Sequence, residues 1–387
     1  MAAFFKFLSA ALFTSLTISA TNSAMAAAAS SSGTSPPIKG AYYPSWLQSS
    51  FPISSIRPRL FTHLYYAFLS PETATFRFQI DPQTAASLLN FTSSVHSISP
   101  PVKALFAVGG AGAGATALLS AMAADSSSRA NFILSAIELS RKFQFDGIDL
   151  DWEYPQNPAE MTNLASLLRE WRVAIAAEAA ATSRPPLLLT AAVYFSSQLS
   201  LSGPLRAYPA PAIAGNLDWI NVMNYDYHGG WDPTATGAHA ALFDPTSGNL
   251  STSSGLRSWI EAGVPASKVC MGMPLYGRTW QLKDPRLSGI GAPAVDVGPG
   301  ENRSGVLTYA EIVKFNREHK AKEIYDPKTV SVYSVAGNSW IGYDDAMSVS
   351  VKVWYARGLK LRGYFFWDVT GDYKWKISKT ASKILST

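Results

Sequence analysis

Residues 146–154 read DGIDLDWEY, with a carboxylate at every second position from Asp149 through Asp151 to Glu153. Side chains alternate along a β-strand, so these three acids are expected on one face and the apolar residues between them on the other. Carboxylates spaced about 7 Å apart on one face repel one another. This repulsion raises at least one pKa enough to keep a proton near neutral pH. A carboxylic acid of that kind can protonate a leaving oxygen, as glycosidic cleavage requires.

Two other interpretations of this segment are disfavoured. A solvated edge strand with an acidic face conflicts with the apolar flanks and with Gly147, which begins a stretch typical of a buried sheet. A metal site is disfavoured because hard cations prefer carboxylates gathered on a loop with carbonyl and water oxygens. No pair of histidines suggests zinc. We therefore expect neither a metal nor any other cofactor.

Short apolar runs that recur along the chain must position the acids. Several of them, such as 64–68, are continuously apolar, which is typical of parallel strands buried on both faces. The predicted strands are 38–46, 63–69, 103–109, 147–154, 187–195, 219–227, 269–276 and 363–369.

Helical periodicity fills the intervals, most clearly over 127–142 and 158–181. Eight strands alternating with helices predict an α/β fold of the closed (β/α)8 TIM-barrel type. The alternative is an open doubly wound sheet, which would usually bring a Gly-rich nucleotide turn after its first strand. In a barrel the strand runs toward the catalytic rim, so Glu153 is expected nearest the substrate and Asp149 deepest. Asp151 would lie between them, within reach of either neighbour or of the substrate.

One connection is too long for a barrel loop. About 60 residues separate the seventh strand from a predicted helix at 346–357. They contain Gly and Pro turns, a helical segment at 309–319 and an alternating segment at 330–335. We expect a small α+β insertion domain at 279–341, between barrel segments 38–278 and 342–387.

The pattern Asp146-x-x-Asp149-x-Asp151-x-Glu153 resembles the signature of glycoside hydrolase family 18, the chitinases. The resemblance covers most of residues 38–385 and is closest to plant class V chitinases, including the insertion. It implies that Glu153 protonates the glycosidic oxygen, that Asp151 orients the substrate's N-acetyl group and that Asp149 adjusts the charge on Asp151. It also implies substrate-assisted retaining catalysis, in which the acetamido oxygen replaces a carboxylate nucleophile.

Other strand ends match the same family. Met223-Asn224-Tyr225-Asp226 matches Met-x-Tyr-Asp, which implies that Tyr225 donates a hydrogen bond to the acetamido group. Trp367 matches the tryptophan that floors the cleavage subsite, and Tyr276-Gly277-Arg278, predicted to end the seventh strand, matches a segment near the glycan. Barrel packing is the alternative for the aromatic residues. The expected substrate-binding set is Trp367, Met223, Asp226, Arg278, Tyr276, Tyr42, Phe68 and Trp46.

The third strand departs from the family pattern. The usual Ser-x-Gly-Gly is here Ala107-Val108-Gly109-Gly110. The missing hydroxyl is expected to alter the hydrogen bonds of the deep acids and to shift the pH optimum without abolishing the acid. The glycines that follow lack the Lys and Ser/Thr of a phosphate-binding loop.

Composition fits a globular enzyme. A hydrophobic fraction of 47% and a charged fraction of 15% argue against disorder. The formal net charge of +5 comes without a run of Lys or Arg, so no nucleic-acid partner is expected. The single cysteine, Cys270, lies in an apolar run and allows no internal disulfide.

The first 26 residues have the pattern of a signal peptide: Lys6, a short apolar stretch at 7–18 and small residues before position 27. A membrane anchor is disfavoured because the stretch is too short to span about 30 Å of hydrocarbon. We expect a flexible mature N-terminus (27–37) and a monomer secreted to the apoplast or vacuole, with no membrane attachment after cleavage. Glycosylation acceptors at Asn90, Asn249 and Asn302 fit that route.

The expected activity is hydrolysis of β-1,4 bonds in chitin or N-acetylglucosamine oligomers. The alternative from another class is a chitinase-like lectin that binds such glycans without cleaving them. Lectins of this type usually lose the acid or its helpers, whereas Glu153, Asp151 and Tyr225 are all present. Action on a modified signal oligosaccharide, and transglycosylation, stay open because acceptor-side loops control them. A role in plant defence is implied by the resemblance alone.

Overall fold

The structure, a computed structural model, describes residues 36–199, 201, 204–246 and 248–386. The predicted signal peptide and residues 27–35 of the predicted flexible N-terminus lie outside the described residues. From Ile38 onward the chain forms one compact unit.

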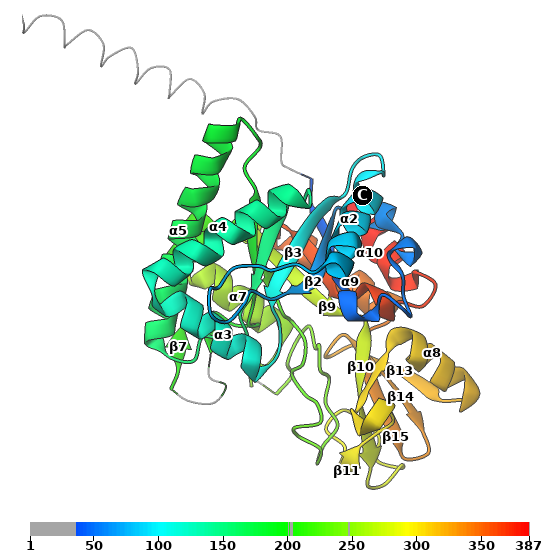
Figure 1. The fold of residues 1–387 in the computed structure, drawn as a ribbon. Coiled ribbons are helices and arrows are strands. Elements are labelled where there is room, and N and C mark those ends of the chain that lie inside the picture. The colour runs from blue at the N-terminus through cyan, green and yellow to red at the C-terminus, as the bar shows by residue number, and fades with distance from the viewer. Residues whose placement is uncertain (1–35, 200, 202–203, 247, 387) are drawn as a thin grey trace, which may run out of the picture. The chain divides into compact units, whose positions relative to one another are not determined.

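Eight parallel strands close into a barrel, which confirms the predicted (β/α)8 fold (Figure 1). Around the barrel each strand pairs with the next in the order β1-β2-β3-β4-β5-β8-β9-β16, and β16 pairs with β1. The strands are β1 (Ile38–Pro44), β2 (His63–Leu69), β3 (Lys103–Gly109), β4 (Gly147–Asp151), β5 (Leu188–Val193), β8 (Trp219–Val222), β9 (Val269–Pro274) and β16 (Gly363–Trp367).

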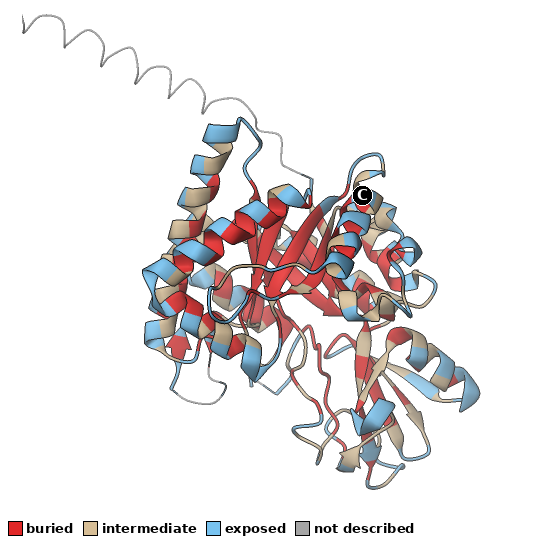
Figure 2. Ribbon diagram, viewed as in Figure 1, coloured by how far each residue is buried: buried red, intermediate tan, exposed pale blue. Residues whose placement is uncertain are grey.

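Helices cover the outside of the barrel, and Figure 2 shows the strands buried within them. The longest helix, α5 (Pro158–Thr182), begins where the Asn157 side chain accepts a hydrogen bond from the backbone N–H of Glu160, with proline at its first turn. Its Trp171 packs edge-on against Phe132 of α4 (Ser126–Lys142), with ring centroids 5.0 Å apart. None of the helices in the described residues combines the length and apolar character needed to cross a bilayer.

The other helices and short elements connect this framework. The α-helices are α2 (Pro82–His96), α3 (Ala113–Ala124), α6 (Ala210–Asn216), α7 (Thr252–Glu261), α9 (Ala346–Gly358) and α10 (Lys376–Ser386). The 3-10 turns are η1 (Ser45–Leu47), η2 (Ile53–Ser55), η3 (Pro58–Leu60), η4 (Ala266–Lys268), η5 (Glu301–Arg303) and η6 (Val369–Gly371). Two short strands of two residues each, β6 (Gln198–Leu199) and β7 (Arg206–Ala207), pair antiparallel.

The two faces of β4 have different surroundings, as its alternating sequence predicts. Ile148 and Leu150 belong to the large core between barrel and helices. Asp149 and Asp151 point into the barrel, where Tyr42 of β1 donates a hydrogen bond to Asp149. The strand ends at Asp151, so Glu153 lies just beyond it on the rim rather than within the strand.

Several predicted strands are too long at this same rim. The run 219–227 forms strand only as far as Val222, and Met223 to Tyr227 continue as a loop. Apolar and aromatic residues continue past the last ladder pairs because they line the rim, so hydrophobicity alone overestimates strand length there.

An antiparallel sheet follows β9, in the order β11-β10-β15-β14-β13, with β12 also paired to β10. Its elements are β10 (Tyr276–Leu282), β11 (Ala294–Val297), β12 (Val306–Thr308), α8 (Tyr309–Glu318), β13 (Lys322–Asp326), β14 (Ser331–Ala336) and β15 (Ser339–Tyr343). Figure 1 shows its labelled strands together beside α8, in yellow-green to orange. Trp280 and Trp340, both fully buried, pack edge-on at 5.4 Å in its core.

The new sheet begins earlier than the predicted boundary at 279. The barrel strand β9 ends at Pro274, and the chain turns to antiparallel partners from Tyr276 onward. The prediction that Tyr276 and Arg278 end the seventh barrel strand is therefore wrong. They belong to β10, the first strand of the insertion, because the extended chain changes its hydrogen-bond partners there.

Candidate active site

The carboxyl ends of the barrel strands surround a pocket of about 370 Å³. Every predicted site residue except Asp149 and Arg278 lies in its wall. The lining residues are Tyr42, Trp46, Phe68, Ala111, Asp151, Glu153, Ala192, Met223, Tyr225, Asp226, Tyr276 and Trp367. Sequence reasoning missed Ala111 and Ala192, whose small side chains carry no chemical signal and instead leave space.

Asp149 lies beneath the pocket and is fully buried. Its Oδ2 accepts a hydrogen bond from the Tyr42 hydroxyl at 2.7 Å. Its Oδ1 accepts from the Thr190 hydroxyl at 2.5 Å and from the Asn221 amide at 3.3 Å. Burial raises the pKa of Asp149 to about 6, and these three donors limit the rise.

Thr190 and Asn221 were not among the predicted site residues. Each is a polar residue inside an otherwise apolar strand, Thr190 in β5 and Asn221 in β8, and each is fully buried. A buried polar side chain needs a partner. That interruption is the sequence signal that could have identified both residues.

Asp151 lies between the deep acid and the rim, with 4% of its surface exposed. Its Oδ1 has no hydrogen-bond partner among the described residues. Burial raises the pKa of Asp151 well above its ordinary value, and the charges of Glu153 and Asp149 raise it further. A buried carboxyl oxygen without a partner is costly, so Asp151 is poised to hold a proton or to meet a ligand.

Glu153 lies at the rim of the pocket. The Thr116 hydroxyl donates a hydrogen bond to the Glu153 carbonyl and fixes the backbone there. Burial raises the pKa of Glu153 to about 7; Tyr154 opposes this rise through a hydrogen bond, and the negative charge of Asp226 adds to it. The side chain therefore holds a proton near neutral pH while facing the pocket, as a general acid must.

Asp226 follows β8 and adopts a left-handed backbone conformation, with φ of 60°. The Tyr276 hydroxyl lies 2.8 Å from its Oδ1, and the Arg278 guanidinium contacts both its oxygens. The buried His239 has Nδ1 3.6 Å from Oδ1, outside hydrogen-bonding distance. Burial raises the pKa of Asp226, but the contact with His239 and the positive charge of Arg278 outweigh it, and the pKa falls below its ordinary value.

Arg278 lies behind Asp226 instead of in the pocket wall. Its guanidinium also lies 4.9 Å from the ring of Trp231, a residue that is 60% exposed. Trp231 was not predicted as a site residue, because a single tryptophan in a long loop carries no periodic signal. The structure thus brings Arg278 to the site through Asp226, and a direct contact with a glycan stays a prediction.

Aromatic side chains form the floor and one wall of the pocket. Trp367 lies nearly parallel to Phe68, with centroids 5.8 Å apart, and 5.6 Å from Tyr42. Trp46 lies nearly parallel to Phe68 at 6.1 Å, its ring is also 6.4 Å from that of Trp367, and it is 58% exposed. Exposed aromatic surface of this extent in a concave site is typical of a binding surface.

Tyr225 keeps its hydroxyl proton at any ordinary pH. Burial raises its pKa well above the usual value, and the charges of Asp151 and Glu153 raise it further. The hydroxyl is consequently available as a hydrogen-bond donor into the pocket, as its motif implies.

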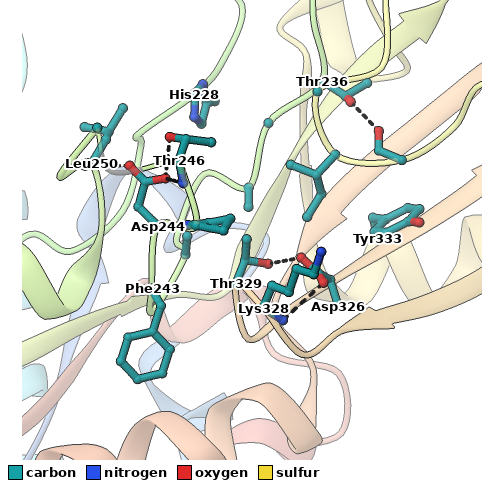
Figure 3. Close-up of a pocket in the computed structure, with 18 of the residues that line it drawn as sticks. His228, Thr236, Phe243, Asp244, Thr246, Leu250, Asp326, Lys328, Thr329 and Tyr333 are labelled. Atoms are coloured by element: carbon teal, nitrogen blue, oxygen red, sulfur yellow. Dashed lines mark hydrogen bonds between the residues drawn. The ribbon is translucent and has the colours of Figure 1, made fainter.

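A larger hollow of about 700 Å³ lies elsewhere, between the loop after β8 and the insertion (Figure 3). The carboxylates that line it accept hydrogen bonds from residues of their own loops. Asp244 accepts from Thr246 and from the Leu250 backbone, and Asp326 accepts from Thr329. Hydrogen bonds from Thr246 offset burial and lower the pKa of Asp244, which stays ionised. Proton-transfer chemistry therefore belongs to the smaller pocket. No group of His, Cys, Asp and Glu in the described residues is arranged to hold a metal ion.

Comparisons with known proteins agree with this geometry. The family model described as glycosyl hydrolases family 18 matches residues 39–372. The class V chitinase CHIT5b of Medicago truncatula is 49% identical over 348 residues, covering 89% of this chain and 90% of the relative. Nod factor hydrolase protein 1 of the same plant is 49% identical over 352 residues, covering 89% of each chain. The crystal structure of a Cycas revoluta GH18 chitinase in complex with (GlcNAc)3 matches with a TM-score of 0.85 at 42% identity, covering 90% of this chain and 99% of that one.

Proposed function

The chain belongs to glycosyl hydrolase family 18, and on that premise we propose that it is a chitinase that cleaves β-1,4 bonds in chitin or N-acetylglucosamine oligomers with retention of configuration. The observation that carries this proposal is the position of Glu153 in the wall of a pocket that Trp367 also lines, where burial raises the pKa of Glu153 to about 7. Relatives named as class V chitinases and a family structure holding (GlcNAc)3 support the substrate class.

The first step uses the protonated state of Glu153. A sugar ring stacks on Trp367, and Glu153 donates its proton to the glycosidic oxygen as the bond to the anomeric carbon breaks. The acetamido oxygen of the same sugar attacks that carbon and forms an oxazolinium ion. Asp151, whose Oδ1 is unpartnered among the described residues, orients the acetamido group together with the Tyr225 hydroxyl.

The second step regenerates the acid. Glu153, now a carboxylate, takes a proton from water, and the water oxygen attacks the anomeric carbon from the face that the leaving group vacated. Asp226 is poorly suited to act as a covalent nucleophile because Arg278 and Tyr276 already occupy its oxygens. In the proposed mechanism, which follows that of the family, the acetamido group supplies the intramolecular nucleophile, and two inversions give net retention.

A second candidate substrate is a modified N-acetylglucosamine signal oligosaccharide. The support is the relative named Nod factor hydrolase protein 1, which is as similar to this chain as the class V chitinase is. Both substrates contain the same β-1,4 linkage, so the same acid and acetamido chemistry would serve either one.

Secretion as a monomeric glycoprotein completes the proposal. The three acceptor residues Asn90, Asn249 and Asn302 are all exposed, so a glycan attached to any of them would extend into solvent. Expression of the full chain in plant leaves, followed by assay of apoplastic fluid, vacuoles and cytosol, tests the location. A glycosidase-sensitive mass in either of the first two fractions supports the proposal, and a cytosolic unglycosylated protein contradicts it.

Product analysis on defined oligomers tests the proposed activity. N-acetylglucosamine hexamer is incubated with the wild-type chain and with Glu153→Gln, and the anomer formed first is read by proton NMR. We expect the β-anomer from the wild type and no cleavage from the variant. Binding without cleavage by the wild type would identify a lectin, whereas initial α-anomer would contradict the retaining mechanism.

A further inference from the structure

Three residues on neighbouring strands form one row inside the barrel. Ala107 of β3 is the register partner of Asp149 on β4, and Asp149 is the register partner of Thr190 on β5. All three are fully buried and face the lumen. Thr190 places a hydroxyl 2.5 Å from Asp149 Oδ1, whereas Ala107 presents only a methyl group from the other side.

We propose that Thr190 is the positioning residue that holds the deep carboxylate of Asp149 in its ionised form, in place of the hydroxyl that position 107 lacks. The proposal rests on the chitinase activity proposed above and deepens it. The family motif carries serine at position 107, on β3, and this chain offers its hydroxyl from β5 instead.

Hydrogen-bond donation explains how Thr190 would act. Asp149 has no cationic partner in the hydrogen bonds described, and its donors are Thr190, Tyr42 and Asn221. Burial raises its pKa to about 6, and each donor to the carboxylate lowers it. The Asn221 bond is longer at 3.3 Å, so it does not replace the Thr190 bond. Removing the Thr190 hydroxyl must therefore raise the pKa of Asp149.

A change in the pKa of Asp149 should affect catalysis because of the groups that surround this carboxyl. Tyr42, Tyr65, Tyr225 and Cys270 interact with it electrostatically, and burial raises the pKa of each above its ordinary value, so they stay uncharged. Asp151 also interacts with Asp149, and unlike these four groups it can gain or lose a proton in the same pH range. Burial and the charge of Glu153 raise the pKa of Asp151, and an ionised Asp149 raises it further, which favours a proton there, next to the substrate.

The test compares Thr190→Val, which has a similar shape without the hydroxyl, with Thr190→Ser, which keeps it. We expect the acidic limb of the kcat profile to move up by about one pH unit in the valine variant, because a hydrogen bond to a charged group has that effect. At a pH on that limb, kcat should fall about tenfold. The serine variant should resemble the wild type.

The double variant Thr190→Val/Ala107→Ser provides the rescue. A hydroxyl returned from β3 should move the acidic limb back toward the wild-type position. An unshifted limb in Thr190→Val, or a shift that the second hydroxyl leaves unchanged, would overturn the proposal. Loss of activity with an unshifted profile would indicate a purely structural role and overturn it too.

Thermal unfolding between pH 4 and pH 8 separates this inference from the proposed function. Thr190→Val should be destabilised more at pH 8 than at pH 4, because ionised Asp149 loses its donor. This readout needs no substrate. If the wild type does not cleave chitin oligomers, the proposed chitinase function is contradicted, whereas the pH-dependent destabilisation still tests the role of Thr190. Equal destabilisation at both pH values contradicts the role of Thr190.

Discussion

Arg278 holds both oxygens of Asp226: its Nε lies 2.9 Å from Oδ1, and a terminal guanidinium nitrogen lies 2.8 Å from Oδ2. A planar fork of this kind fixes both the position and the orientation of a carboxylate. Since Arg278 lies on β10 of the insertion and Asp226 follows barrel strand β8, the pair joins the insertion to the rim at the proposed substrate pocket.

Replacing Arg278 with lysine should loosen Asp226 while keeping the positive charge. Lysine is a point charge and cannot make the two-pronged contact. We expect KM for N-acetylglucosamine oligomers to rise on the order of tenfold, as loss of a charge-assisted hydrogen bond implies, with a smaller change in kcat. Tyr276→Phe removes one donor to the same carboxylate and is the matched comparison, with a smaller increase. Unchanged KM in Arg278→Lys would contradict a positioning role.

Trp367 should contribute much of the oligomer affinity. Its ring forms the pocket floor against Tyr42 and Phe68. Trp367→Ala should weaken binding about tenfold to a hundredfold, as truncation of an aromatic anchor at a binding site does, and Trp367→Phe should retain more affinity. Calorimetry in the Glu153→Gln background measures Kd without turnover. Equal Kd values for the alanine variant and its parent would rule out stacking.

Tyr225→Phe isolates one hydroxyl without disturbing packing. If that hydroxyl stabilises the acetamido group as it attacks, its loss should reduce kcat by about a hundredfold and leave KM nearly unchanged. Steady-state kinetics on a soluble oligomer measures both constants. A rise in KM with normal kcat would assign the hydroxyl to ground-state binding instead.

Ionisation of Glu153 should lower the free energy of unfolding as pH rises. Its folded pKa is about 7, against an ordinary value of 4.5, so the folded state binds the proton more tightly than the unfolded state. The stabilisation is complete below pH 4.5 and is lost as pH rises through 7, by as much as about 3 kcal/mol. Glu153→Gln cannot ionise and should therefore be more stable than the wild type at pH 8 but not at pH 4.

Denaturant unfolding across that range measures the effect. Glu318→Gln, which alters an exposed carboxyl on α8, serves as the control and should follow the wild type at every pH. A Glu153→Gln curve parallel to that of the wild type would show that Glu153 has an ordinary pKa in the folded protein.

The barrel was predictable because its strands are buried on both faces. Continuously apolar runs such as those containing Tyr65 and Phe106 indicate a parallel sheet, and the alternation of Asp149 with Leu150 assigns the two faces of β4. Strand ends were less predictable, because residues such as Met223 stay apolar after the ladder ends.

The candidate site was predictable along strands but not across them. Spacing on one strand placed Asp151 above Asp149, and motif resemblance selected Tyr225. The donors Thr190 and Asn221 come from strands distant in sequence, and only barrel register brings them to Asp149. Likewise, Arg278 reaches the site because β10 pairs with the insertion sheet, a change of partners that periodicity does not reveal.

The pH dependence of kcat/KM for the wild type and Glu153→Gln tests the central claim that Glu153 is the proton donor. The wild-type value should fall as pH rises above about 7, because that limb reports the acid of the free enzyme. Glu153→Gln should be at least about a hundredfold slower at pH 6, as loss of a general acid implies. Turnover of chitin oligomers by the folded variant at the wild-type rate would contradict the account.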